Sequence, residues 1–220
     1  MPPVHASAPV GIQEFLASGF AVKEHLASYL GLTAEEVSQR LPQSKENLAA
    51  MHPGAFDPDR AADFYEDTVG TAHLFELAAW HLGSPDYIAD TLRLQQQFAR
   101  GDVLDFGGGI GTHALAAAGL ESVCHVWFVD LNPQNRAFVQ DRAARLGLSD
   151  RVSVYRDLAS IPDQSFDTVV CLDVLENLPE PSAQLMEFHR RLTPDGRALL
   201  NWYFFKGHDG EYPFHFDDPQ

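Results

Sequence analysis

Four glycines and an aspartate stand together near the middle of the chain, in the ten residues VLDFGGGIGT at positions 103–112. The apolar residues around Asp105 are typical of a strand covered on both faces, and glycines at 107, 109 and 111 allow positive φ and a close approach of the backbone to a ligand. An alanine-rich helix is predicted from Thr112 to Leu120. The strand, glycine turn and helix start together predict a site for a nucleotide-like cofactor.

The chemistry of this site depends on Asp105. Gly109, Gly111 and Ala114 also fit the G-x-G-x-x-G/A pattern of nicotinamide and flavin enzymes. A carboxylate two residues before the first glycine can meet a cationic amino acid moiety, but it would repel a pyrophosphate. The pattern therefore favours a cationic cofactor, and a nicotinamide-dependent oxidoreductase is the less favoured alternative.

Acidic residues also end the next predicted strands. Asp130 follows the apolar run 126–129, nineteen residues after Gly111, where a carboxylate can accept both ribose hydroxyls. Asp157 and Leu158 follow the alternating strand 152–155 and suit an adenine amino group and ring face. A fourth strand is predicted over 166–171, and Pro194-Asp195-Gly196 predicts a turn into a fifth from Arg197 to about Phe204.

Helices must position these strand ends. Asn132-Pro133 predicts a capped helix that closes near Gly147, and a further helix is expected to run through Leu192. The first hundred residues have mostly helical patterns, with a capping box over 33–36, a cap and proline at 84–85, and an apolar, buried central helix over 71–82. We expect a helical region over 1–100, which covers the substrate or forms a dimer, and a cofactor-binding domain over 101–220.

The order of these motifs resembles that of class I S-adenosylmethionine-dependent methyltransferases of the small-molecule type. The matching blocks are VLDFGGGIGT, FVDLNP, YRDL and CLDVLENLPEP with LTPDGRALL behind it, within residues 102–205. The resemblance implies an α/β fold with a doubly wound, mostly parallel Rossmann-like sheet of order 3-2-1-4-5. It also implies S-adenosylmethionine as cofactor, S-adenosylhomocysteine as product, and methyl transfer to an O, N or C nucleophile of a small molecule.

The resemblance assigns roles to residues at the strand ends. Asp105 and the glycine backbone would face the methionine part of the cofactor, Asp130 the ribose, and Asp157 with Leu158 the adenine. Residues just after the fourth strand would line the reaction centre. The implied cofactor-binding set is Asp105, Gly107, Gly108, Gly109, Gly111, Asp130, Leu131, Asp157, Leu158, Leu172 and Asp173.

One position departs from the pattern in a way that concerns catalysis. Many enzymes of this kind have a histidine where this chain has Asn177, and an amide cannot take a proton. A hydroxyl acceptor would need another base, such as His208, His215 or Tyr203, whereas an amine, thiolate or activated carbon needs none. The catalytic candidates are therefore Asn177, Tyr203 and His208, and a non-catalytic cofactor-binding or structural subunit is a further alternative.

Other polar and aromatic side chains are weaker candidates. Asp173 and Glu176, with histidines in the tail, have the residue types of a divalent cation site, but a solvated acidic tail is the better interpretation and no metal is expected. The aromatics of the helical region and two histidines at helical spacing could line an acceptor cavity, although such residues usually belong to a core. These residues are Phe64, Tyr65, Phe75, Trp80, Tyr87, His73 and His81.

The family's usual sheet has seven strands, and too few residues follow the fifth predicted strand to form the last two. We therefore expect a shortened chain whose apolar strand 198–204 is covered by a second subunit, with partial cover from Tyr212, Phe214 and Phe216. A homodimer follows from this expectation.

Composition restricts the partners. With 31 acidic against 15 basic residues the formal charge is −16, which disfavours nucleic acids and acidic lipid surfaces and leaves a small-molecule acceptor. The sequence has neither a long apolar run nor a secretory pattern, so no membrane partner and a cytoplasmic location are expected. Cys124 and Cys171 are expected to be buried free thiols.

Overall fold

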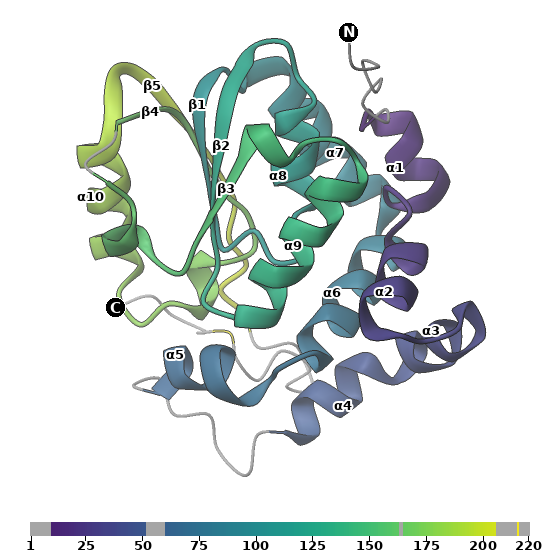
Figure 1. Cartoon of the computed structure of the whole chain (residues 1–220). Helices are drawn as coiled ribbons and strands as arrows, with labels where there is room; N and C mark the ends of the chain where they lie inside the picture. Colours follow the sequence, from purple (N-terminus) through teal and green to yellow (C-terminus); the bar gives the residue numbers. More distant parts are fainter. Residues whose placement is uncertain (1–9, 52–59, 163–164, 206–214, 216–220) are drawn as a thin grey trace, which may run out of the picture.

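A single sheet of five parallel strands forms the centre of the computed structural model, which describes residues 10–51, 60–162, 165–205 and 215 (Figure 1). The strand order is β3-β2-β1-β4-β5, which confirms the predicted fold class and topology. The strands are β1 Gly101–Phe106, β2 Val123–Val129, β3 Val152–Tyr155, β4 Phe166–Cys171 and β5 Leu192–Leu200. The order reverses between β1 and β4, which places the ends of these strands at a topological switch point, where ligands of such sheets bind.

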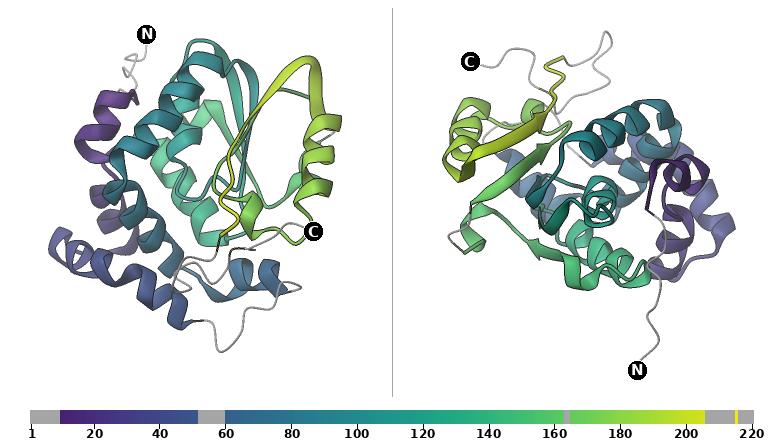
Figure 2. Two further views of the ribbon diagram at one scale, coloured as in Figure 1. Left: turned by 180° about the vertical axis from the view of Figure 1, so that it is seen from behind. Right: turned by 90° about the horizontal axis from the view of Figure 1, so that it is seen from above.

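Helices cover both faces of the sheet. α7 (Pro85–Phe98), α8 (Thr112–Ala118) and α9 (Pro133–Arg145) lie on one face, and α10 (Pro181–Arg191) lies on the other (Figure 2). Two cores result. Val103 and Phe128 pack with Leu115 of α8 on the first face, and Leu104 packs with Phe188 of α10 on the second. The alternation of side chains along β1 therefore serves two cores at once.

Helices α1 to α4 and α6 lie on the side of α7, α8 and α9, whereas α5 lies below the lower end of the sheet (Figures 1 and 2). Thr33 and Glu36 form the predicted capping box, and the predicted central helix is α6 (Ala72–Gly83). The other elements here are α1 Ile12–Ser18, α2 Val22–Leu30, α3 Ala34–Arg40, η1 Leu41–Gln43, α4 Ser44–Ala50, α5 Ala61–Asp63 and η3 Phe64–Thr68, which is a π-helix. α1 packs on α7, and α2 and α6 pack on α9, so this region is joined to the sheet through its helices.

The fifth strand differs from the prediction at both ends. Phe166 and Thr168 of β4 pair with Leu192 and Arg197, so the predicted turn 194–196 is an irregularity inside β5 and not a connection before it. The strand ends at Leu200 because the side chain of Asn201, which follows, is bound to Asp173. The residues predicted to continue the strand are solvent-exposed, with exposed fractions of 58% for Trp202 and 50% for Tyr203.

Two local predictions are also wrong. Cys124 is exposed, because it lies at the solvent-facing start of β2, whereas Cys171 is buried. Ser84 precedes Pro85 at the start of α7, but its side chain makes no capping hydrogen bond because its backbone is not in the extended conformation typical of a cap.

Tyr212, Phe214 and Phe216 lie outside the described residues. None of the helices in the described ranges has the length and apolarity needed to cross a membrane.

Candidate cofactor and acceptor site

The glycine turn follows β1 and is held by backbone hydrogen bonds. The amide of Gly107 donates to the carbonyl of Val129 at 2.8 Å, which ties the turn to the end of β2. A Cβ atom on Gly108 would lie 2.5 Å from the ring of Phe128 and 2.6 Å from Oδ2 of Asp105. Gly109 has φ +56, a conformation that L side chains rarely adopt. The turn therefore requires glycine at these positions and exposes bare backbone to the adjacent cavity.

Asp105 is the most unusual acidic group at this site. Its side chain is 3% exposed, and Oδ2 has no hydrogen-bond partner among the described residues. Burial, followed by the nearby charge of Asp130, raises the pKa of Asp105 to about 7. A buried carboxylate oxygen without a donor costs free energy, so this group is suited to a cationic ligand group in the cavity.

Asp130 ends β2 and is bound from three directions. Oδ2 accepts the amide of Gly109 at 2.9 Å, and Oδ1 accepts the amide of Asn132 at 2.8 Å and Nδ2 of Asn135 at 3.2 Å. Burial raises the pKa of Asp130 to about 6, although these hydrogen bonds oppose the shift. A carboxylate has about four acceptor positions, so Asp130 retains capacity for one more donor. Leu131 follows, and its carbonyl accepts a hydrogen bond from Arg136.

Asp157 lies at the end of β3 and caps the short helix η5 (Leu158–Ser160). Its side chain accepts the hydroxyl of Ser160 at 2.6 Å and the amide of Ser160 at 2.8 Å. These hydrogen bonds, the hydroxyl first, and the contact with Arg156 lower the pKa of Asp157. Arg156 also pairs with Glu66 of the π-helix, which connects the β3 end to the N-terminal region. Leu158 is 9% exposed and packs in the core beneath.

Asp173, two residues after β4, has a strained backbone. Its φ is +57, which is uncommon for a residue other than glycine. Two side chains hold it there. Asn201 accepts the amide of Asp173 at 2.6 Å, and Oδ1 of Asp173 accepts Nδ2 of Asn201 at 3.0 Å and the hydroxyl of Tyr87 at 2.8 Å. Strain maintained by surrounding contacts is typical of functional sites.

The predicted catalytic residues Asn177, Tyr203 and His208 do not come together as one group in the described part of the structure. Asn177 lies beside the site, where its Oδ1 accepts the hydroxyl of Tyr65 at 3.3 Å and its Nδ2 donates to the carbonyl of Asp173 at 3.4 Å. The side chain of Tyr203 is half-exposed and contacts the rings of Phe205 and His215. His208 lies outside the described residues. Among the described residues, Asn177 therefore contacts the segment after β4 through its side chain, and Tyr203 contacts it through its backbone amide, which donates to Glu176.

One face of α6 closes the cavity over the glycine turn. The cavity has a volume of about 80 Å³ and is lined by Leu77, Trp80, His81, Ile88, Asp105, Gly107, Gly108, Gly109, His113, Leu172 and Asp173. Hydrogen bonds of 2.8 Å join His81 to Thr112 and His113 to Thr91, and burial lowers the pKa of His81 to about 3 and that of His113 to about 4. These histidines are therefore neutral parts of the wall.

The residues present fit an S-adenosylmethionine molecule in chemistry but not in free volume. The unpartnered oxygen of Asp105 suits its cationic amino acid part, and the bare glycine backbone permits close approach. The free volume is well below the roughly 300–1,000 Å³ of small-molecule sites. Leu77 occupies space beside the turn, since a Cβ atom on Gly109 would lie 2.8 Å from its Cδ1.

Several residues of this site were missed or undervalued by the sequence patterns. The sequence pattern predicts Asn201 only as part of a strand and Leu77 only as part of a buried helix. Trp80, His81 and Tyr87, which are weak candidates by sequence, line the cavity or bind Asp173, whereas Phe64 and Phe75 are core residues. The spacing of 73, 77, 80 and 81 on one helical face was the available signal. No cluster of three metal-ligating side chains occurs in the described part of the chain.

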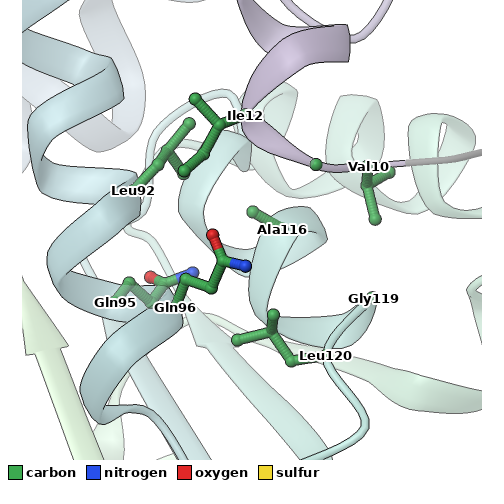
Figure 3. Close-up of a pocket in the computed structure, with 9 residues that line it drawn as sticks. Val10, Ile12, Leu92, Gln95, Gln96, Ala116, Gly119 and Leu120 are labelled. Atoms are coloured by element: carbon green, nitrogen blue, oxygen red, sulfur yellow. The ribbon is translucent and has the colours of Figure 1, made fainter.

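A second cavity lies away from the glycine turn, between α1, α7 and α8. It has a volume of about 100 Å³ and is lined by Val10, Gly11, Ile12, Leu92, Gln95, Gln96, Ala116, Gly119 and Leu120 (Figure 3). Gln95 is 1% exposed and donates from Nε2 to the carbonyl of His113 at 2.9 Å. This contact links the second cavity to the helix that follows the glycine turn.

Comparison with known proteins agrees with this geometry. The ubiquinone biosynthesis O-methyltransferase of Xanthomonas oryzae pv. oryzae is 32% identical over 120 residues, covering 53% of this chain and 47% of that protein. The enzyme of the same name from Pseudomonas syringae pv. tomato is 33% identical over 103 residues, covering 45% of this chain and 43% of that protein. The chain thus spans less than half the length of these curated relatives.

A structural comparison supports the same fold. The [4+2]-cyclase SpnF superposes with a TM-score of 0.54 and 23% identity, over 67% of this chain and 61% of that one. A family model described as "Methyltransferase domain" matches residues 79–206, from within α6 to beyond β5. Together with the strand order and the motifs at the strand ends, this match shows that the chain belongs to the class I methyltransferases, whose cofactor is S-adenosylmethionine.

Proposed function

We propose that this protein transfers the methyl group of S-adenosylmethionine to a small-molecule acceptor. The observation that carries the proposal is the buried carboxylate of Asp105, with one oxygen lacking a partner, at the edge of a bare glycine turn. A carboxylate in this position suits a cofactor with a cationic amino acid part. Family membership supports the same reaction class.

The residues that would hold the cofactor follow the strand ends. Asp105 and the backbone of 107–111 would bind the methionine part, Asp130 and Leu131 the ribose, and Asp157 and Leu158 the adenine. Leu172 and Asp173 would lie beside the reaction centre. When bound, S-adenosylmethionine supplies an electrophilic methyl group on sulfur, and the chain contributes alignment of the acceptor and exclusion of water.

The acceptor side would be formed by the N-terminal helical region over 1–100. Leu77 and Trp80 of α6 line the cavity, and Tyr65 and Tyr87 are bound to Asn177 and Asp173. The formal charge of −16 supports a small acceptor over a nucleic acid. The relatives named as ubiquinone biosynthesis O-methyltransferases act on small molecules according to that name, which supports the same class here.

A binding and turnover experiment tests the proposal. Titration calorimetry should show that S-adenosylhomocysteine binds to the wild-type protein and that Asp105→Asn weakens this binding. Mass spectrometry of reactions with labelled S-adenosylmethionine should then detect transfer to members of an acceptor panel. Absence of cofactor binding would overturn the proposal. Binding without transfer to any acceptor would instead favour the alternative of a non-catalytic cofactor-binding subunit.

A further inference from the structure

Beside Asp173 lies a second buried carboxylate with an unused oxygen. Glu176 follows β4 in the short helix η6 (Leu175–Asn177) and is 1% exposed. Its carboxylate accepts the backbone amide of Tyr203, but Oε2 has no hydrogen-bond partner among the described residues. Buried acceptors without donors are rare and costly. Unlike Asp105, this group lies after β4, on the side expected to face the acceptor.

Trp80 and Tyr87 lie on the side of Asp173, and Tyr65 lies near enough to Glu176 to be affected by its charge. Tyr87 donates to Asp173, and its ring lies 5.6 Å from that of Trp80. Tyr65 donates to Asn177, the neighbour of Glu176 in the chain. Carboxylates combined with aromatic faces attract organic cations, through ion pairing and cation–π contacts respectively.

The chain itself supplies little positive charge at this point. Among the described residues, Lys45 interacts with Glu76 and His215, and Arg136 binds carbonyls near Asp130. His215 is the basic group that acts on Asp173, and burial lowers its pKa, so it is largely neutral at pH 7. Among the described residues, neither Asp173 nor Glu176 forms an ion pair with a lysine or arginine side chain.

The two tyrosines show what this environment does to a titrating ligand. Burial, followed by Glu76 and Glu176, raises the pKa of Tyr65, and burial, followed by Asp173, raises the pKa of Tyr87. A phenol acceptor placed here would likewise resist ionisation, which would slow O-methylation. Burial would also disfavour an ammonium group, but the carboxylates would stabilise it, whereas burial and carboxylates both oppose a phenolate.

We propose that the methyl acceptor is an amine that binds as an ammonium ion beside Asp173 and Glu176, among the rings of Tyr65, Trp80 and Tyr87. This inference rests on the proposed function. The carboxylate of Glu176 takes one proton from the ammonium, and the freed nitrogen lone pair forms a bond to the methyl carbon. The carbon–sulfur bond breaks with its electron pair left on sulfur, the product nitrogen carries the positive charge, and Glu176 returns its proton to solvent.

Burial raises the pKa of Glu176 to about 7, which suits a group that exchanges a proton near neutral pH. Asn177 then needs no role as a base. It positions Tyr65 and the carbonyl of Asp173 through its two hydrogen bonds.

Matched ligands test the charge preference. Dissociation constants of 2-phenylethylamine, 2-phenylethanol and 4-ethylphenol are measured by calorimetry or ligand-observed NMR, with and without saturating S-adenosylhomocysteine. We expect the amine to bind at least about tenfold more tightly than the alcohol or the phenol.

Glu176→Gln, which keeps an acceptor for the amide of Tyr203, should remove this preference without changing S-adenosylhomocysteine affinity. Glu180→Gln, at an exposed site four residues on, should leave both unchanged.

Equal binding of amine and alcohol, or retention of the preference in Glu176→Gln, would overturn the inference. If Glu176→Gln does not fold, Asp173→Asn tests the amine preference measured without S-adenosylhomocysteine, because its side-chain oxygen can still accept from Tyr87 and Asn201. The preference measured without S-adenosylhomocysteine decides this inference separately from the proposed function, which fails if S-adenosylhomocysteine itself does not bind. Detection of N-methylated product, and no methylated phenol, would support the proposed chemistry.

Discussion

The guanidinium of Arg142 donates to the carbonyl of Ile110, inside the glycine turn, at 2.7 Å. Arg142 is fully buried, and its other contacts are the carbonyls of Gly19 and Phe20 and Nδ1 of His25. Burial lowers its pKa to about 9, and no carboxylate pairs with it among the described residues. One cation, bound largely by carbonyl dipoles, thus joins the turn to the connection between α1 and α2.

Arg142→Met should therefore affect both folding and cofactor binding. Three buried carbonyls lose a donor, which we expect to lower the free energy of unfolding by roughly 3–5 kcal/mol. The folded fraction should bind S-adenosylhomocysteine more weakly because the turn loses its support at Ile110. Urea denaturation and calorimetry measure the two effects. Arg145→Met is the control, since Arg145 pairs with Asp141 and Ser28 at the surface and the substitution should change stability by less than about 0.5 kcal/mol.

Asp130→Ala should weaken binding of S-adenosylhomocysteine. The expected loss is about 1.5–3 kcal/mol, the range for hydrogen bonds to a charged group. Calorimetric affinity provides the measurement. The exposed Asp150→Ala should behave as wild type. An affinity unchanged in Asp130→Ala would refute the ribose assignment.

Asp105 should lower the stability of the protein as pH rises toward 7. Because its pKa is raised to about 7, the folded protein keeps a proton that the unfolded chain loses above about pH 4. This group therefore lowers the free energy of unfolding as pH rises from about 4 to 7, by up to roughly 1.4 kcal/mol per pH unit, and has no further effect above that window. Asp105→Asn should lack this contribution. Urea denaturation from pH 4.5 to 7.5 compares the two proteins.

The difference between the two curves isolates Asp105. Burial lowers the pKa of His73, His81 and His113, which makes stability rise with pH. These residues are present in both proteins, so their effect largely cancels. Parallel curves for wild type and Asp105→Asn would show that Asp105 does not titrate in this window.

Ala21→Gly should stabilise the protein. Ala21 precedes α2 with φ +56, and the left-handed region costs a residue with a Cβ atom about 1–2 kcal/mol. Glycine removes most of that cost but loses more entropy on folding, so we expect a net gain of about 0.5–1 kcal/mol. Thermal unfolding measures it. Ala27→Gly, inside α2, should instead lower stability by about 1 kcal/mol, and equal effects of the two changes would contradict the argument.

A homodimer through the β5 edge stays a prediction. In the described part of the chain β5 pairs only with β4, and Trp202 and Tyr203 beside its end are exposed. Open edges with adjacent apolar side chains favour pairing with another chain. Light scattering at micromolar concentration should report a dimer, and Trp202→Ser should shift the protein toward monomer. A wild-type monomer at all concentrations would exclude this arrangement.

The sequence by itself determined the central sheet. The glycine turn, the apolar strand runs and the caps at Thr33 and Asn132 act over a few residues, so their meaning does not depend on distant parts of the chain. Parallel strands joined by helices then permit few orders, and the family motifs select one. The strand order and the positions of Asp105, Asp130 and Asp157 at strand ends followed from these patterns.

The tertiary structure decided which side chains complete the site. Tyr87 and Asn201 meet at Asp173 although 114 residues separate them, and Arg142 binds Gly19 across 123 residues. The predicted end of the fifth strand is wrong for the same reason. The side chain of Asn201 binds Asp173, which follows β4, and the strand stops before it. Hydrogen bonds between distant polar groups depend on how helices pack on the sheet, and no local pattern of residues records that packing.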